Sequence, residues 1–244
     1  MLARRGDRLE HLARELDARD VRALALTADV TRDGDLERAA QAALDAFGSI
    51  DVVIANAGFG VSGRMDELTL DDVRRQFETN VFGVLRTLYA TLGALKASRG
   101  AFAAVGSVAS YLAMPTQGPY TMSKHAVRAL CETLVVELAP HGVSTTHIAP
   151  GFIDTEIRRV DNRGTFRAER KEIIPRFAMM PSAVAARKIA DAIAMRAPEV
   201  VLTGHGKLGV FFARHAPRTT SRIMRLAPHR PPKGDAPPPA PRNP

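Results

Sequence analysis

Short, strongly apolar segments alternate with longer segments of helical periodicity along most of the chain, and this alternation restricts the fold more than any other feature. A short apolar run fits a buried strand, whereas leucines three and four positions apart mark one face of a helix. Strands that alternate with helices form a parallel sheet covered on both faces. The sequence therefore predicts a doubly wound α/β fold. The predicted strands are residues 21–26, 51–55, 101–105, 144–148 and 199–203, and the predicted helices are residues 4–19, 35–47, 70–96, 120–138 and 181–196.

Polar or turn-forming residues follow four of the predicted strands. They are Asp29, Asn56, Ser107 and Pro150. The carboxyl ends of parallel strands lie at one edge of a sheet, and ligands of such sheets bind there. We therefore expect these residues to converge on one site.

A serine, a tyrosine and a lysine are the strongest candidates for chemistry. Tyr120 follows Ser107 by 13 residues, and Lys124 lies four residues further, near the start of a predicted helix. Residues four apart share a helix face. An ammonium beside a phenol lowers the phenol pKa from about 10, so that a proton can be exchanged near neutral pH. Ser107 can hydrogen-bond the same substrate oxygen. The alternative is a surface tyrosine and lysine at a helix start.

Three further motifs surround this group in a fixed order. They are FETNVFG with Asn80, the tripeptide Asn56-Ala57-Gly58, and Pro150-Gly151 followed by Thr155. Together with the serine and the Y-x-x-x-K helix they resemble the short-chain dehydrogenase/reductase family over about residues 1–204. The resemblance implies a Rossmann-like sheet that binds a nicotinamide dinucleotide.

The resemblance also implies a role for each matching residue. Tyr120 is expected to act as the acid/base, Lys124 to lower its pKa and hold the nicotinamide ribose, and Ser107 to orient the substrate oxygen. Asn80 is expected to kink its helix and hold a water that links Lys124 to solvent; otherwise it is an ordinary polar mid-helix residue. The implied cofactor-binding residues are Asp29, Val30, Asn56, Ala57, Gly58, Tyr120, Lys124, Pro150, Gly151, Ile153 and Thr155.

Two arginines bear on which cofactor is bound. Arg4 and Arg5 lie where the family's second strand ends. An acid at this place binds the ribose hydroxyl of NAD, whereas an arginine accommodates the 2′-phosphate of NADP. NADP is therefore expected, with NAD as the second possibility. The alternative is that both arginines are simply solvated at the start of a helix.

One family motif, the Gly-rich turn T-G-x-x-x-G-x-G, has no match in the sequence. In the family this turn joins the first strand to the first helix and holds the cofactor pyrophosphate. We expect an N-terminally truncated fold without the first strand, the Gly-rich turn and the first helix. A start assigned too late, or an incomplete fragment, is the favoured explanation. The alternative is a catalytically inactive remnant that acts through its surface or its basic tail.

The expected activity is hydride transfer between a nicotinamide cofactor and a ketone or secondary alcohol. Residues 156–180 correspond to the family's variable substrate lid and carry several large apolar side chains. These suit a hydrophobic substrate, or they merely anchor the lid. The family's usual assemblies predict a homodimer or homotetramer.

Composition limits the setting of this activity. With 244 residues and 45% hydrophobic content, the chain can bury a substantial core. No apolar run reaches 18 residues, and residues 1–16 have no secretory signal pattern. The single Cys131 excludes an internal disulfide and fits a cytoplasmic protein. The histidines have no metal-ligand spacing, so no metal is expected.

The C-terminal part carries +7 of the net charge of +8. Beyond the catalytic domain, residues 205–226 form a basic, apolar extension, and residues 227–244 form a Pro-rich tail expected to be disordered. Residues 207–226 fit weak contact with an anionic membrane surface, a cover for the substrate pocket or a subunit contact. No motif supports specific nucleic-acid binding.

Overall fold

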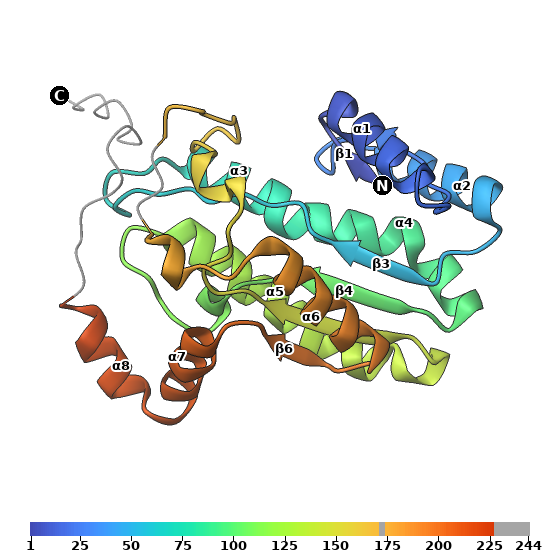
Figure 1. Ribbon diagram of the computed structural model, residues 1–244. Helices are drawn as coiled ribbons and strands as arrows, with labels where there is room; N and C mark the ends of the chain where they lie inside the picture. The colour runs from blue at the N-terminus through green and yellow to red at the C-terminus, as the bar shows by residue number, and fades with distance from the viewer. Residues whose placement is uncertain (171–173, 227–244) are drawn as a thin grey trace.

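All strands of the computed structural model, which describes residues 1–170 and 174–226, pair in parallel. Four strands form one sheet in the order β3-β4-β5-β6, and two short strands form a second sheet, β1-β2 (Figure 1). The strands are β1 (Leu2–Ala3), β2 (Leu26–Thr27), β3 (Val52–Ala55), β4 (Ala101–Val105), β5 (Ser144–Ala149) and β6 (Glu199–Val201). The predicted parallel α/β fold is confirmed.

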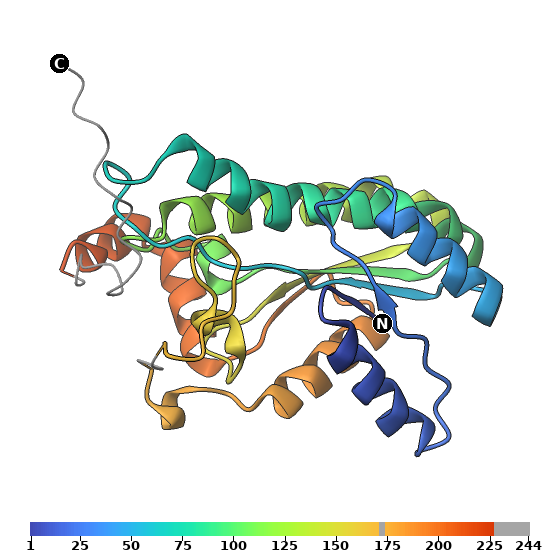
Figure 2. The same cartoon turned by 90° about the horizontal axis from the view of Figure 1, so that it is seen from above.

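Helices cover both faces of the four-stranded sheet. Helices α2, α4 and α5 lie on one side, and α1 and α6 lie on the other (Figure 2). The helices are α1 (Gly6–Asp17), α2 (Asp35–Phe47), α3 (Leu70–Phe77), α4 (Gly83–Ser98), α5 (Gly118–Glu137), α6 (Ser182–Ala194), α7 (Gly204–His215) and α8 (Pro217–Met224). Single helical turns lie at η1 (Glu78–Phe82), η2 (Val108–Ser110), η3 (Ala139–His141), η4 (Glu156–Arg159) and η5 (Arg176–Ala178).

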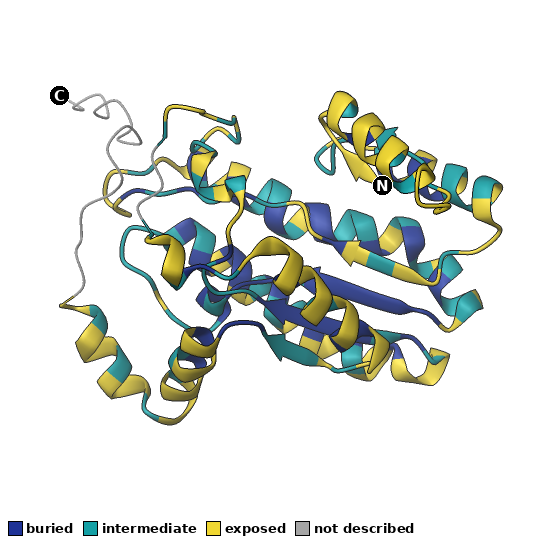
Figure 3. Cartoon of the chain, viewed as in Figure 1, coloured by how far each residue is buried: buried dark blue, intermediate teal, exposed yellow. Residues whose placement is uncertain are grey.

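The core divides into two layers because side chains of β4 alternate between the faces of the sheet. Phe102 and Ala104 pack with Val127 and Cys131 under α4 and α5. Ala101 and Ala103 join the opposite layer under α6. Burial raises the pKa of the Cys131 thiol to about 12, so this residue is a small core side chain, as expected. In Figure 3 most of β4 is coloured as buried, in line with the burial of residues 101–104.

The predicted long helix over residues 70–96 is divided by a π-helical turn. A capping box at Thr69 starts α3, since the Thr69 side chain accepts from the Asp72 N–H and the Asp72 carboxylate accepts from the Thr69 N–H. Residues 78–82 then form the π-helical turn η1, and α4 continues beyond it. Such turns are rare and often mark functional positions. Asn80 lies inside this one.

The predicted strand over residues 21–26 is largely wrong. Only Leu26 and Thr27 form β2, because its one neighbour, β1, is itself two residues long. Among the described residues β1 pairs only with β2, and β3 pairs only with β4. Each therefore has one open edge, and the Val52 and Ile54 side chains of β3 are about half exposed. The two sheets face each other without a strand between them.

The C-terminal extension folds into two helices. The proline at position 217 ends the helical run and begins α8, as its missing N–H requires. No helix among residues 1–170 and 174–226 is long and apolar enough to cross a membrane. The expectation of a disordered tail concerns residues 227–244, which lie outside the described residues.

Candidate active site

Ser107 lies two residues beyond the end of β4, where the chain turns sharply. Its backbone is extended, and its Oγ accepts a hydrogen bond of 3.1 Å from the Ala109 N–H, which caps the turn η2. The Ser107 N–H in turn donates to Ser110 Oγ at 3.3 Å. Both bonds fix the serine at the carboxyl end of the central strand.

Tyr120 and Lys124 lie one turn apart in the first part of α5. Gly118 and Pro119 begin this helix, with the proline at a position where no N–H is needed. The Lys124 Nζ lies 5.7 Å from the centre of the Tyr120 ring and donates to the Val105 carbonyl at 2.7 Å. The spacing predicted from the sequence therefore brings both side chains to the end of β4.

The ionisation of this pair differs from the expectation. Burial raises the pKa of Tyr120, while its hydrogen bond with Ser107 works in the opposite direction. Burial also lowers the pKa of Lys124 to about 8. The predicted lowering of the phenol pKa by the ammonium is therefore not the dominant effect in this structure, because desolvation outweighs it.

Asn80 joins α5 to the loop after β3. Its Nδ2 donates to the Phe59 carbonyl at 3.0 Å and to Ser123 Oγ at 3.1 Å, and its Oδ1 accepts from the Phe59 N–H at 3.1 Å. Ser123 Oγ donates to the Tyr120 carbonyl at 2.7 Å. A Cβ at Gly58 would come within 3.1 Å of Asn80 Oδ1 and 3.6 Å of Lys124 Nζ, so a side chain here would crowd the Asn80 amide.

Gln76 hydrogen-bonds the same loop as Asn80, and the sequence analysis did not identify it. It is fully buried, its Nε2 donates to the Phe59 carbonyl at 2.8 Å, and its Oε1 accepts from the Val61 N–H at 2.6 Å. It lies one turn before Asn80 on the same helix face. That spacing, with two amides four residues apart, is the signal that could have revealed it.

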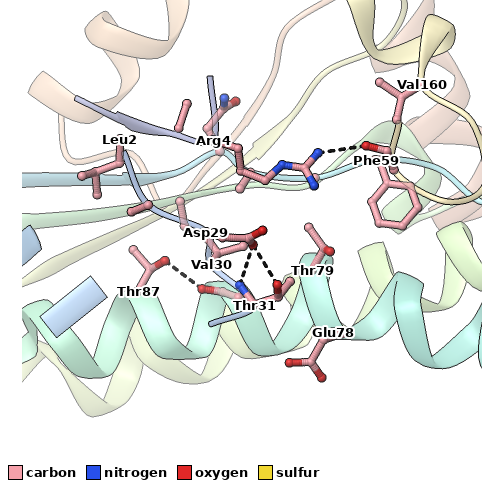
Figure 4. A pocket seen from close by; sticks show the side chains of 18 of the residues that line it. Leu2, Arg4, Asp29, Val30, Thr31, Phe59, Glu78, Thr79, Thr87 and Val160 are labelled. Atoms are coloured by element: carbon pink, nitrogen blue, oxygen red, sulfur yellow. Dashed lines mark hydrogen bonds between the residues drawn. The ribbon is translucent and has the colours of Figure 1, made fainter. Parts of the chain in front are cut away.

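A cavity of about 890 Å³ lies between β1 and β3; Phe59, which bonds Asn80, lines it, whereas Ser107, Tyr120 and Lys124 do not. Figure 4 shows Arg4, Asp29, Val30 and Phe59 among the side chains that line it. Seven of the predicted cofactor residues line the cavity: Arg4, Arg5, Asp29, Val30, Asn56, Ala57 and Gly58. The structure thus brings these predicted residues together at the carboxyl ends of the strands.

Asp29 is held in a fixed orientation on the cavity wall. Its Oδ1 accepts from the Thr31 N–H at 3.0 Å and from the Thr31 hydroxyl at 2.8 Å. Burial acts to raise the pKa of Asp29, but the Thr31 bonds and the charges of Arg4 and Arg32 outweigh it and lower the pKa. The carboxylate is therefore ionised and can accept hydrogen bonds from a ligand.

Arg4 and Arg5, two of the arginines that line the cavity, also contact the segment 156–180. Arg4 Nη2 donates to the Gly164 carbonyl at 2.9 Å, and Arg5 pairs with Glu156 at 3.1 Å. Arg8, which does not line the cavity, pairs with the same Glu156 carboxylate at 2.8 Å. These contacts tie the start of α1 to the segment that follows β5.

The other predicted cofactor residues lie outside the large cavity: Tyr120 and Lys124 on α5, and Pro150, Gly151, Ile153 and Thr155 beyond β5. A Cβ at Gly151 would lie 2.2 Å from Thr203 Oγ1, so glycine is required for close packing there. Ile153 packs in the core layer under α6. Thr155 lines a separate cavity of about 230 Å³ in the lid. Pro150 accepts, through its carbonyl, the hydrogen bond of 2.9 Å from the Val108 N–H.

The lid itself is held to the loop after β3. Asn162 Nδ2 donates to the Ser62 carbonyl at 2.7 Å, and Asn162 Oδ1 accepts from the Ser62 N–H at 2.9 Å. Of its apolar residues, Phe177 is 93% exposed and Ile157 is partly exposed. In the described part of the chain no group of three metal-ligating side chains occurs.

Comparisons with known proteins agree with this architecture. The family model described as short chain dehydrogenase matches residues 1–165. The chain is 33% identical over 199 residues to an A-factor type gamma-butyrolactone 1′-reductase of Streptomyces virginiae, covering 79% of this chain and 75% of that protein. It is 32% identical over 174 residues to an uncharacterized oxidoreductase of Staphylococcus epidermidis, covering 71% and 73%.

A solved structure gives the same result. An alcohol dehydrogenase from Thermococcus sibiricus, complexed with 5-hydroxy-NADP, superposes with a TM-score of 0.71 at 30% identity, covering 82% of this chain and 83% of that chain. The chain belongs to the short-chain dehydrogenase family. It is therefore an oxidoreductase with a Rossmann-like fold.

Proposed function

We propose that the protein is an NADP-dependent carbonyl reductase or alcohol dehydrogenase, with NAD as a second cofactor. The observation that carries the proposal is the meeting of Ser107, Tyr120 and Lys124 at the end of β4, next to Gly58, which lines the cavity of about 890 Å³. The substrate is a ketone or secondary alcohol with a hydrophobic substituent, which fits the apolar residues of the lid. The cofactor of the Thermococcus sibiricus relative supports NADP.

The residues of the site have distinct roles in this reaction. The nicotinamide cofactor, when bound, supplies or accepts the hydride. The Tyr120 hydroxyl gives its proton to the carbonyl oxygen during reduction and takes it back during oxidation. Ser107 donates a hydrogen bond to the same oxygen as charge develops there. The Lys124 ammonium stabilises the phenolate that Tyr120 becomes after giving up its proton.

Asn80 completes this group as a positioning residue. Its amide holds both the loop after β3 and Ser123, whose hydroxyl bonds the Tyr120 carbonyl. We propose that Asn80 and a water connect Lys124 to solvent, so that the proton lost by Tyr120 is replaced.

The residues present fit much of the cofactor. The ionised carboxylate of Asp29 and the neighbouring Val30 suit the adenosine end of the cofactor. Arg4 and Arg5 suit a 2′-phosphate. The small residues of Asn56-Ala57-Gly58 allow a dinucleotide to approach the backbone. Thr155 and Ile153 are assigned to the nicotinamide end by resemblance alone. In the described residues no Gly-rich turn faces the cavity, so the pyrophosphate site is incomplete.

The open edges of β1 and β3 suggest how this site is completed. We propose that a further parallel strand fits between them in the complete enzyme and leads through a Gly-rich turn into a helix. The half-exposed Val52 and Ile54 and the open backbone edges would then be covered. The helix N-terminus would hold the pyrophosphate.

A screen of ketones and secondary alcohols tests the proposed activity. The chain carrying such an N-terminal strand, turn and helix is mixed with NADPH or NADH and the substrate panel, and nicotinamide absorbance is followed. Oxidation of NADPH with at least one hydrophobic ketone is expected. No turnover with any substrate, despite saturable NADPH binding, would favour the rival proposal of an inactive protein that acts through its surface or basic tail.

Arginine variants test the choice of cofactor. Arg4→Ala or Arg5→Ala should raise the KM for NADPH roughly ten- to a hundredfold, because a charged hydrogen bond contributes about 1.5–3 kcal/mol. The KM for NADH should hardly change. Arg8→Ala is the matched control, since Arg8 shares the Glu156 partner but lies outside the cavity. Equal effects on NADH and NADPH would contradict the assignment.

The surface of α7 and α8 suits weak contact with an anionic membrane. Phe211 and Phe212 are about half exposed, Leu208 and Ile223 are more exposed, and residues 204–226 contain no acidic side chain (Figure 3). Sedimentation with phosphatidylserine vesicles should exceed that with phosphatidylcholine vesicles and should fall in the double variant Phe211→Ser, Phe212→Ser. Equal sedimentation with both lipids would exclude this proposal.

We also propose that the protein forms a homodimer or homotetramer, and light scattering measures its oligomeric state.

A further inference from the structure

A network of polar side chains extends behind Ser107, and apart from Ser107 its members have no role in the reaction described above. It runs from the turn after β4 through β5 to β6. Its central member, His147, is 1% exposed and lies on β5. The network consists of Ser107, Ser110, His147, Tyr111 and Glu199.

The direction of each hydrogen bond in this network follows from its last member, Glu199. Glu199 can only accept, so the Tyr111 hydroxyl donates its single proton to Glu199 Oε2. The Tyr111 oxygen can then only accept from His147, whose Nδ1 lies 3.1 Å away. Nδ1 of His147 therefore carries the proton.

The directions of the other two hydrogen bonds in the network follow from this tautomer. With the proton on Nδ1, the Nε2 of a neutral imidazole is an acceptor, and the Ser110 hydroxyl donates to it across 3.3 Å. Ser110 Oγ is left to accept the Ser107 N–H, also at 3.3 Å. All these bonds are thus satisfied at once by a single protonation state of His147.

The surroundings of His147 hold the ring in this place. A Cβ at Gly106 would lie 2.0 Å from His147 Nε2, so glycine immediately before Ser107 leaves the room that the imidazole occupies. At the far end, Arg214 of α7 pairs with Glu199 at 2.7 Å. Arg128 of α5 stacks 4.3 Å over the Tyr111 ring.

We infer that His147 is a positioning residue for Ser107: as the neutral Nδ1–H tautomer, it orients the Ser110 hydroxyl, and this hydroxyl anchors the Ser107 backbone. The inference rests on the proposed role of Ser107. It also connects helix α7, through Arg214 and Glu199, to the turn that carries Ser107.

The charges around His147 favour the neutral ring. Burial lowers its pKa to about 4, and Arg128, Lys124 and Arg214 act in the same direction, whereas Glu132 acts weakly against them. A folded-state pKa below the ordinary value of 6.5 means that the unfolded chain binds more protons between these values. Protein stability should therefore rise as the pH increases from about 4 to 6.5.

Nitrogen NMR of the histidine rings tests the tautomer on the full chain without cofactor or substrate. The His147 signals should show a protonated Nδ1 and an unprotonated Nε2 between about pH 5.5 and 8, the range above its pKa of about 4. A proton on Nε2, or an imidazolium at neutral pH, would overturn the inference even if the enzyme were active.

Two substitutions distinguish the roles of the two ring nitrogens of His147. His147→Gln places an amide oxygen near the Nε2 position and keeps an acceptor for Ser110, whereas His147→Asn places its amide near Nδ1 and loses that acceptor. His147→Asn should speed hydrogen exchange of the Ser107 amide and lower kcat about tenfold or more at unchanged KM for NADPH. In His147→Gln, the exchange rate of the Ser107 amide and kcat should both stay close to their parental values.

Controls distinguish this role from a merely structural one. His125→Gln, on the exposed side of α5, should change neither quantity. If the Gln and Asn variants lose kcat equally, or if Ser107 exchange is unchanged in His147→Asn, His147 does not position the serine. If the chain that carries the added N-terminal strand, turn and helix binds NADPH and shows the expected tautomer and exchange but no turnover, the proposed function fails and the network remains.

Discussion

Tyr120→Phe should lower kcat for carbonyl reduction by roughly a hundred- to ten-thousandfold, the usual contribution of a positioned acid or base. The variant removes only the hydroxyl that gives its proton to the substrate oxygen. Its ring should still pack against the loop after β3, where a Cβ at Gly60 would lie 3.5 Å away. The dissociation constant for NADPH should therefore remain nearly unchanged. Single-turnover kinetics and an NADPH titration measure the two quantities.

A matched tyrosine provides the control for this experiment. Tyr89 lies on α4 and is 67% exposed, so Tyr89→Phe should leave both kcat and NADPH binding unchanged. Carbonyl reduction at the parental rate in Tyr120→Phe would show that another group transfers the proton. Equal losses in the two variants would indicate a general effect of the substitution.

Adding an N-terminal strand, Gly-rich turn and helix should convert a chain without saturable NADPH binding into one that binds it. The added strand would pair with the open edges of β1 and β3 and complete the pyrophosphate site. It should also raise the free energy of unfolding, because burying the exposed half of Val52 and Ile54 contributes on the order of 1 kcal/mol for each side chain. Nicotinamide fluorescence and denaturant unfolding measure these effects.

A second variant with the added segment distinguishes the effect of the added strand from that of the Gly-rich turn. Replacing the glycines of the added turn with alanine should keep the gain in stability but abolish NADPH binding, since the backbone could no longer approach the pyrophosphate. Saturable binding of NADPH by residues 1–244 alone would instead show that the Gly-rich turn is dispensable. The proposal for the gap between the two sheets would then be wrong.

Local patterns predicted the regular parts of this fold well. The helix over residues 35–47 and the strand over residues 101–105 match α2 and β4 residue for residue. Gly48 supplies the left-handed backbone that ends the helix, and β4 is flanked by β3 and β5. The proximity of Tyr120 and Lys124 also followed from spacing alone, because a helix fixes residues four apart on one face.

Features set by distant contacts were not predictable in the same way. The strand over residues 21–26 shortened because a strand needs a partner of equal length, which a local pattern does not supply. The π-helical turn at residues 78–82 coincides with the bonds of Asn80 to Phe59, 21 residues away. The His147 network joins residues separated by up to 88 positions. The pairing of Arg5 with Glu156 spans 151 positions.

Deuterium transfer tests the central claim most directly. The extended chain is incubated with NADPH that carries deuterium at the transferable position of C4 and with a ketone that is turned over in the screen. The alcohol should contain one deuterium at the former carbonyl carbon, and Tyr120→Phe should form it far more slowly. An alcohol without deuterium, or no alcohol despite saturable NADPH binding, would contradict hydride transfer at this site.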